Sequence, residues 1–132
     1  MTSFPKESDV VIIGGGIIGV STAYYLAKSG VSVTLVEKGI IAGEQSSRNW
    51  GFVRQQGRDP AEIPTIMRSL ALWRGLSKEL GEDIGFKQAG VFYLANTEEQ
   101  VAGYEDWLKH AKEYQIDSHI VPKAEIQKYL SL

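Results

Sequence analysis

The chain has 132 residues, 43% of them hydrophobic, a length and composition that fit one soluble domain. Its 14 basic and 16 acidic side chains give a formal net charge of −2, which predicts no nucleic-acid-binding face. No apolar run approaches the roughly 20 residues of a membrane span, and the first residues lack the apolar core of a signal peptide, so we expect a cytoplasmic protein. The absence of cysteine excludes disulfides, thiolate metal sites and cysteine nucleophiles, and two histidines are too few for a metal cage.

The first predicted elements form a β-α-β unit. Residues 9–13 are a short, largely β-branched apolar run, which predicts a strand buried on both faces. Apolar residues recur every three or four positions over 17–28 and Gly30 follows as a stop signal, which predicts a helix. Alternating apolar residues over 31–37 predict a second strand. Such a crossover is right-handed, so the two strands are expected to be parallel.

A long segment without a sustained period follows this unit. Residues 38–58 contain four glycines and many polar side chains. Trp50 and Phe52 argue against disorder, and a loop of this length is then expected to be functional.

A helix is predicted after the loop. Residues 59–62, Asp-Pro-Ala-Glu, have the pattern of a helix start, and an apolar stripe over 63–80 predicts a helix that ends at Gly81. Pro64 lies beyond the first predicted position and removes a hydrogen bond, so the regular helix is alternatively expected to begin there. The apolar stripe indicates core packing.

The rest of the chain predicts a mixture of strand and helix. Residues 90–95 indicate a strand, with a further short strand at 85–87. Residues 97–100 match a capping box, which predicts a helix with an apolar face over 101–111. A last helix is expected over 123–129.

The densest glycine cluster fits the pattern GxGxxG at Gly14, Gly16 and Gly19. In this pattern the first glycine permits the tight turn, the second lets a diphosphate approach the backbone, and the third lets the helix pack closely on the sheet. The diphosphate would lie at the start of the helix near Ile17, where the dipole is positive. Glu37 at the end of the second strand can accept hydrogen bonds from a ribose diol and would repel the extra phosphate of NADP.

The motif alone leaves three alternatives open: FAD, NAD, or a glycine turn that only packs a helix. Two observations favour FAD. The motif lies almost at the N-terminus, and the long loop contains residues 46–49, Ser-Ser-Arg-Asn, whose donors suit a diphosphate or a flavin ring. An NAD domain would ordinarily return to a helix within a few residues of the second strand.

Residues 9–54, DVVIIGGGIIGVSTAYYLAKSGVSVTLVEKGIIAGEQSSRNWGFVR, resemble the N-terminus of FAD-dependent oxidoreductases of the D-amino acid oxidase superfamily. The resemblance is most specific at the glycine motif, at Glu37 with Lys38, and at residues 46–54. It implies an α/β fold: a Rossmann-like βαβ FAD-binding domain with a parallel sheet over 1–84, and the beginning of an α+β substrate domain over 85–132. Because relatives have several hundred residues, we expect a truncated N-terminal portion.

The resemblance also implies roles for individual residues. The residues implied to receive the FAD diphosphate are Gly14, Gly15, Gly16, Ile17, Ile18 and Gly19. Glu37 is implied to hold the adenosine ribose and Lys38 to lie near the adenine. The residues implied to pass along the flavin are Ser46, Ser47, Arg48, Asn49 and Gly51. Relatives with covalent FAD have a histidine near Arg48, and because arginine cannot make that bond, non-covalent FAD is expected.

The implied enzyme oxidises the C–N bond of an amino acid or secondary amine by hydride transfer to flavin N5. Arg54 lies near a position where some relatives present a cation to the substrate carboxylate, and an ordinary ion pair is the alternative. Expected partners are a small amine or amino-acid substrate and other subunits of an oxidoreductase complex. The fragment alone is expected to be inactive. An NAD-linked oxidoreductase and a non-catalytic dinucleotide-binding module remain alternative functions.

Overall fold

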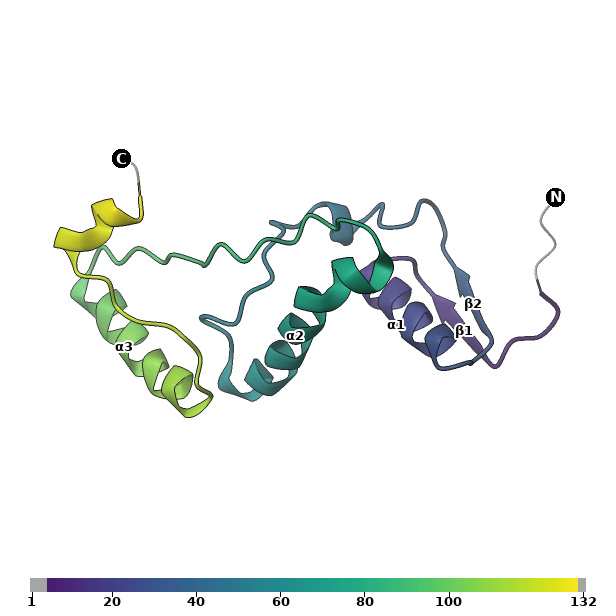
Figure 1. The fold of residues 1–132 in the computed structure, drawn as a ribbon, viewed down its shortest axis with the longest axis horizontal. Coiled ribbons are helices and arrows are strands. Elements are labelled where there is room, and N and C mark those ends of the chain that lie inside the picture. The colour runs from purple at the N-terminus through teal and green to yellow at the C-terminus, as the bar shows by residue number, and fades with distance from the viewer. Residues whose placement is uncertain (1–4, 131–132) are drawn as a thin grey trace. The chain divides into compact units, whose positions relative to one another are not determined.

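The computed structural model describes residues 5–130, and its backbone divides into two compact units, one up to Phe52 and one from Val53. This division into compact units does not test the domain boundary predicted at residue 84, which stays a prediction. In chain order the helices and strands (Figure 1) are β1 (Val10–Ile13), α1 (Ile17–Lys28), β2 (Val33–Val36), α2 (Ile63–Leu80) and α3 (Glu98–Glu113). Three short 3-10 turns are η1 (Gln45–Ser47), η2 (Pro60–Glu62) and η3 (Lys123–Lys128).

The first unit is the predicted β-α-β unit. Strands β1 and β2 pair in parallel, with Val10 opposite Val33 and Ile13 opposite Val36, and α1 has the predicted bounds. The second strand is shorter than expected. The Val31 N–H donates to the Leu26 carbonyl at 3.1 Å, so residue 31 closes the helix end. Ser32 donates its N–H to the Asp9 carboxylate at 2.9 Å and accepts the Val10 N–H at 3.1 Å, which ties the chain before β2 to the beginning of β1.

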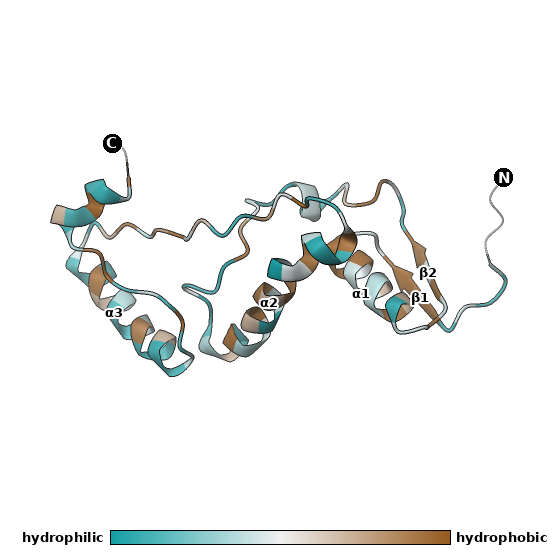
Figure 2. Cartoon of the chain, viewed as in Figure 1, coloured by the Kyte–Doolittle hydropathy of each residue, from teal (hydrophilic) through white to brown (hydrophobic). Residues whose placement is uncertain are grey.

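The sheet is covered on one face only, which corrects the prediction of a strand buried on both faces. Val11 is 59% exposed and Ile13 is 88% exposed, although both strands are apolar (Figure 2). The sheet has two strands, and α1 is the helix that contacts both of them in the described part of this unit. Side chains alternate between the two faces of a strand, so one helix leaves every second residue of β1 exposed, whereas the residues of β2 are all half-buried.

A tight turn joins β1 to α1. Gly14 has φ of +109°, a conformation that side chains rarely adopt, and its N–H donates to the Val36 carbonyl at 2.8 Å. The chain then returns so closely that a Cβ at Gly19 would lie 2.0 Å from the Gly14 carbonyl oxygen. Position 19 therefore accommodates only a hydrogen atom.

The helix start that the sequence predicted in the second unit forms in two steps. The Asp59 side chain accepts the Ala61 N–H at 2.8 Å and caps the 3-10 turn η2. The α-helix itself begins at Ile63, which places Pro64 in the first turn, where its missing N–H is not needed. The helix ends at Gly81, with φ of +71°.

Helix α3 is the predicted helix with a modified capping box. The Thr97 hydroxyl accepts the Gln100 N–H at 3.2 Å. The Gln100 side chain accepts the N–H of Asn96 at 2.7 Å, one residue before the expected partner. The last predicted helix is the 3-10 turn η3. The buried apolar residues described in the chain are Ile63, Leu70 and Ala111.

The strands expected at 85–87 and 90–95 are wrong for this structure. Figure 1 draws the segment between α2 and α3 as an extended connection without strand arrows, and the described residues form one sheet, the β1–β2 pair. A strand exists only where a neighbouring backbone completes its hydrogen bonds. Ring contacts hold the segment instead, including Tyr93 with Tyr104 at 6.1 Å between centroids.

Gly19→Ala tests the close approach of α1 to β1. Because the added Cβ would overlap the Gly14 carbonyl, we expect a loss of about 1–3 kcal/mol in the free energy of unfolding, measured by urea denaturation of the full-length protein. Gly75→Ala is the matched control, since Gly75 lies in α2 and a Cβ added there would meet no atom within 4 Å. That control is expected to be neutral or to gain up to about 1 kcal/mol. Equal effects at both positions would contradict the close approach.

Candidate functional site

The start of α1 has backbone donors without hydrogen-bond partners among the described residues. The Ile17 N–H donates to the Ser46 hydroxyl oxygen at 2.8 Å, and the N–H groups of Gly16, Ile18 and Gly19 have no hydrogen-bond partner within residues 5–130. Ile18 is 79% exposed. The N-terminus of a 12-residue helix is also the positive end of its dipole. These donors are the ones that a phosphate or diphosphate group would require.

Glycines keep the approach to these donors open. Gly16 precedes α1 in an extended conformation, and a Cβ there would lie 3.2 Å from the Ser46 hydroxyl oxygen. A Cβ at Gly15 would lie 2.5 Å from the end of the Ile41 side chain and 3.2 Å from the Glu37 Cβ, so the Ile41 side chain would have to move. The sequence pattern does not indicate this second contact, since residue 41 lies in the irregular loop.

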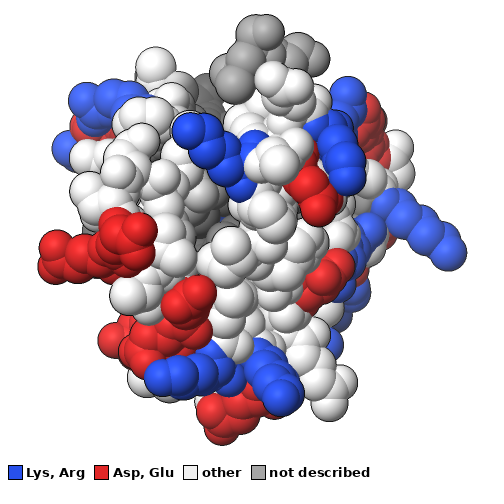
Figure 3. All heavy atoms as spheres, turned by 90° about the vertical axis from the view of Figure 1, so that its left-hand side faces the viewer, with Lys and Arg blue, Asp and Glu red and all other residues white. Residues whose placement is uncertain are grey.

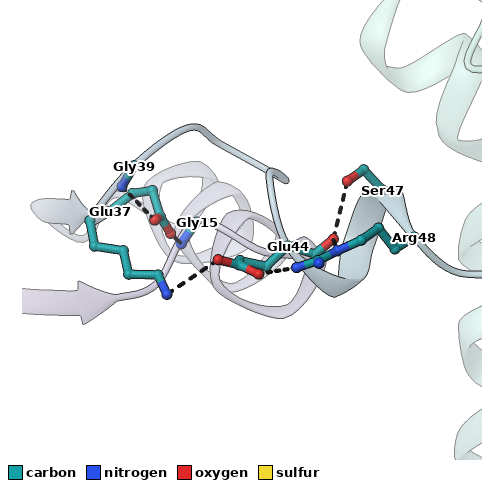
Figure 4. Close-up of polar contacts among 7 residues, drawn as sticks. Gly15, Glu37, Gly39, Glu44, Ser47 and Arg48 are labelled. Atoms are coloured by element: carbon teal, nitrogen blue, oxygen red, sulfur yellow. Dashed lines mark hydrogen bonds and ion pairs between the residues drawn. The ribbon is translucent and has the colours of Figure 1, made fainter.

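Glu37 connects the end of β2 to the glycine turn, as Figure 4 shows. One carboxylate oxygen accepts the Gly15 N–H at 2.7 Å and the other accepts the Gly39 N–H at 2.8 Å. The hydrogen bond from Gly15, followed by that from Gly39 and the charge of Lys38, lowers the pKa of Glu37. Each oxygen keeps a further lone pair that can accept a hydroxyl group.

The loop after β2 closes on the same turn. The Ala42 N–H donates to the Gly15 carbonyl at 2.9 Å, and Ala42 itself has φ of +59°, which is uncommon for a residue with a side chain. Four residues later Ser46 reaches the start of α1. Because a hydroxyl that accepts one hydrogen bond can still donate its own proton, Ser46 retains a donor for an anion placed there.

Glu44 joins two predicted site residues, although the sequence patterns did not single it out. Its carboxylate lies 3.3 Å from the Lys38 ammonium and also pairs with the Arg48 guanidinium. Its backbone carbonyl accepts the Ser47 hydroxyl at 3.1 Å (Figure 4). The spacing of four residues between Glu44 and Arg48 is a sequence signal that could have found the second pair. The pair with Lys38 depends on the loop conformation.

Asn49 organises the end of this loop. Its side-chain NH₂ donates to the Ser46 carbonyl at 2.7 Å, and its side-chain oxygen accepts the Gly51 N–H at 2.6 Å. Gly51 has φ of +69°, which a glycine adopts freely. These contacts fix the loop backbone. The predicted path of Asn49 and Gly51 along a flavin stays a prediction.

A hollow of about 250 Å³ lies beside the Glu37 carboxylate. Its lining comes from the end of β2 and from the loop, namely Glu37, Lys38, Gly39, Ile40, Gly43 and Glu44. The hollow therefore brings together the predicted ribose and adenine residues, Glu37 and Lys38, and adds Glu44. Figure 3 views the molecule from the left-hand side of Figure 1, and on that face basic and acidic side chains both occur.

Arg54 belongs to the second unit and is held by two contacts. Its guanidinium lies over the Tyr93 ring, 5.6 Å from the ring centroid, and it donates a hydrogen bond to the Gln56 carbonyl. Tyr93 and Gln56 also line a hollow of about 330 Å³ with residues of α3. The role of Arg54 toward a substrate carboxylate stays a prediction.

A family model described as FAD dependent oxidoreductase matches residues 9–131. The chain belongs to this family. The match includes β1, the glycine turn, Glu37 and nearly all of the second unit, and it confirms the resemblance to the D-amino acid oxidase superfamily. Membership implies FAD as the cofactor, and the turn with its free donors fits the diphosphate of such a dinucleotide.

The names of individual relatives of this chain refer to the oxidation of amines or amino acids. Sarcosine oxidase subunit beta from Arthrobacter sp is 45% identical over 96 residues, which cover 70% of this chain and 24% of that protein. Glycine oxidase from Bacillus subtilis is 40% identical over 104 residues, covering 73% of this chain and 28% of that protein. The chain thus spans less than a third of either relative.

Solved structures share the fold. L-amino acid deaminase from Proteus vulgaris superimposes with a TM-score of 0.87 at 31% identity, covering 97% of this chain and 31% of that chain. L-proline dehydrogenase from P. horikoshii superimposes with a TM-score of 0.86 at 33% identity, covering 95% of this chain and 33% of that chain. These likenesses confirm the α/β, Rossmann-like fold class.

Two further observations concern what the site and chain lack. Within residues 5–130, no group of three or more acidic or histidine side chains is placed to hold a metal ion. None of the helices in the described part of the chain is long and apolar enough to cross a membrane. The expected cytoplasmic location stays a prediction.

The lowered pKa of Glu37 predicts an acid-dependent contribution to stability. A lowered pKa means that the contacts stabilise the folded state fully above the ordinary pKa of glutamate and are lost as the pH falls through the lowered value. We expect the free energy of unfolding of the full-length protein to exceed that of Glu37→Gln by a constant amount near neutral pH and by less in acid. Asp106 also has a lowered pKa, because of its hydrogen bond from Lys109. Its contribution to the pH dependence is the same in both proteins and is removed when one stability curve is subtracted from the other. A difference that does not vary with pH would contradict this account of Glu37.

Proposed function

We propose that this chain forms the FAD-binding part of an oxidoreductase that oxidises the C–N bond of an amino acid or secondary amine. The observation that carries the proposal is the β1–turn–α1 arrangement, with free N–H groups at Gly16 and Ile18 and with Glu37 bonded to the turn at the end of β2. Family membership and the names of the relatives support the reaction class.

The residues present fit a dinucleotide in three respects. Backbone donors at the start of α1 would bind its two phosphates, and the Ser46 hydroxyl would add a donor. Glu37 would accept the hydroxyls of the adenosine ribose through its remaining lone pairs. Lys38, which lines the same hollow, would lie near the adenine. When bound, FAD would supply the redox chemistry by accepting a hydride from the carbon that bears the amine.

The mode of attachment and the loop contacts extend this proposal. Residues 38–58 contain no histidine, and Arg48 stands near the place where relatives with covalent FAD have one, so non-covalent binding is proposed. Ser47, Arg48, Asn49 and Gly51 would pass along the flavin. Arg54 would present its guanidinium to a substrate carboxylate, a task for which its planar pair of donors is suited.

The substrate class and partners are inferred from the relatives. Their names mention sarcosine, glycine and opines, which are amino acids or N-substituted amino acids. The proposed substrate is therefore a small amino acid with a primary or secondary amine. Two of these relatives are named as subunits, which supports a protein that works in an assembly with other subunits.

Identification of the bound cofactor tests the proposal directly. We expect the purified full-length protein to show flavin absorbance and to release FAD on denaturation, and we expect that absorbance to bleach when sarcosine, glycine or another amino acid is added without oxygen. Mass spectrometry of the released material separates FAD from NAD. Bound NAD, or no dinucleotide at all, would refute the FAD assignment. Bound FAD that no amine or amino acid reduces would favour a non-catalytic dinucleotide-binding module.

Gly16→Val tests the approach of the diphosphate. The branched side chain would fill the space between the turn and the Ser46 hydroxyl, so we expect loss of measurable FAD binding by the refolded or reconstituted full-length protein. Gly75→Val, in the open part of α2, is the matched control and should bind like the wild type. Retained affinity in Gly16→Val would exclude the assigned role of this glycine.

A further inference from the structure

Glu44 is the carboxylate on which the loop after β2 is organised. Its side chain lies 3.3 Å from the Lys38 ammonium and pairs with the Arg48 guanidinium. Its backbone carbonyl accepts hydrogen bonds from the Ser47 hydroxyl at 3.1 Å and from Arg48 Nε at 3.3 Å. One residue thus contacts both Lys38, which lines the hollow beside Glu37, and Arg48 at the end of η1 (Figure 4).

We propose that Glu44 is a positioning residue for the dinucleotide, acting through Lys38 and Arg48 and not by touching the cofactor. This inference rests on the proposed function, because it concerns the same FAD site. It assigns a role to a residue that neither the GxGxxG pattern nor the acidic residue after β2 includes.

The two cations that Glu44 holds would otherwise be free to change rotamer. The Lys38 and Arg48 side chains are 80% and 60% exposed, and long cationic side chains at such exposure lose rotamer freedom when they bind an anion. Tying both to one carboxylate restricts them beforehand. The two side chains then lose less rotamer freedom when the dinucleotide binds, which is the general effect of preorganisation.

Glu44 is also connected to the start of α1. It immediately precedes η1, which carries Ser46. The Ser46 hydroxyl accepts the Ile17 N–H at 2.8 Å, and the Glu44 carbonyl accepts the Ser47 hydroxyl. Contacts that fix the Glu44–Arg48 turn therefore also fix the distance of Ser46 from the proposed diphosphate site.

The negative charge of Glu44 can change the affinity for a dinucleotide in two opposite ways. The cluster of Lys38, Glu44 and Arg48 carries two positive charges and one negative charge. If the Glu44 charge acted only by repelling a diphosphate, removing it would tighten binding. If Glu44 acts by holding the two cations, removing it weakens binding. The sign of the measured change in affinity therefore decides between the two alternatives.

The experiment is a mutant cycle in the full-length protein, with the dissociation constant of added FAD measured by flavin fluorescence after removal of bound cofactor. Glu44→Gln keeps the side-chain shape and removes the charge. We expect its Kd to rise roughly 3- to 10-fold, because the Lys38 and Arg48 side chains would then lose more rotamer freedom on binding. In a Lys38→Gln, Arg48→Gln background, the same substitution should change the Kd by less than about 2-fold, because the cations through which Glu44 acts are gone.

Glu62→Gln is the matched control. Glu62 pairs with Arg58 four residues away, with a nitrogen–oxygen distance of 3.8 Å and 55% exposure, and it lies outside the glycine turn and its loop. Its substitution should leave the Kd of FAD unchanged. A merely structural role of Glu44 would weaken binding equally in both backgrounds, so only coupling to the cations supports a positioning role.

The outcomes separate this inference from the proposed function. If the wild-type protein does not bind FAD, the proposed function fails and the role of Glu44 fails with it. If the wild type binds FAD but Glu44→Gln has an unchanged or lower Kd, only the positioning role is overturned. Equal weakening by Glu44→Gln with and without the two cations would overturn it as well.

Discussion

The contact between the Gly14 carbonyl and the backbone of Gly19 is the constraint on which the first unit depends. A Cβ at position 19 would lie 2.0 Å from that oxygen, so the helix can begin directly beneath the end of β1 only if no side chain is present. This closeness, together with the φ of +109° at Gly14, turns the chain sharply enough to leave the N–H groups of Gly16, Ile18 and Gly19 without a partner among the described residues. The proposed diphosphate site follows from that geometry.

Glu37 ties the second strand to the same turn. Because its carboxylate accepts N–H groups from both Gly15 and Gly39, it fixes the beginning of the long loop against the glycines. Ala42 and Ser46 add two more contacts from the loop to the turn. The acidic residue therefore has a structural role in the chain without ligand, in addition to the ribose-binding role proposed for it.

Local sequence signals predicted the elements that are stabilised by contacts between residues close together in the chain. The bounds of α1 followed from its apolar period and the glycines around it. Asp59 and Pro60 indicated the turn η2, and the alternative start at Pro64 came within one residue of the beginning of α2. Residues 90–95 failed as a strand because pairing needs a partner that periodicity cannot supply. The ion pair between Glu44 and Lys38 could not be predicted either, because the loop that brings the two residues together has no regular period.

A structure of the full-length protein with its bound dinucleotide tests the central claim most directly. We expect FAD with its diphosphate oxygens within hydrogen-bond distance of the N–H groups of residues 16–19, and with the ribose hydroxyls at the Glu37 carboxylate. A dinucleotide whose phosphates are bound by side chains elsewhere, with the start of α1 left in water, would contradict the claim.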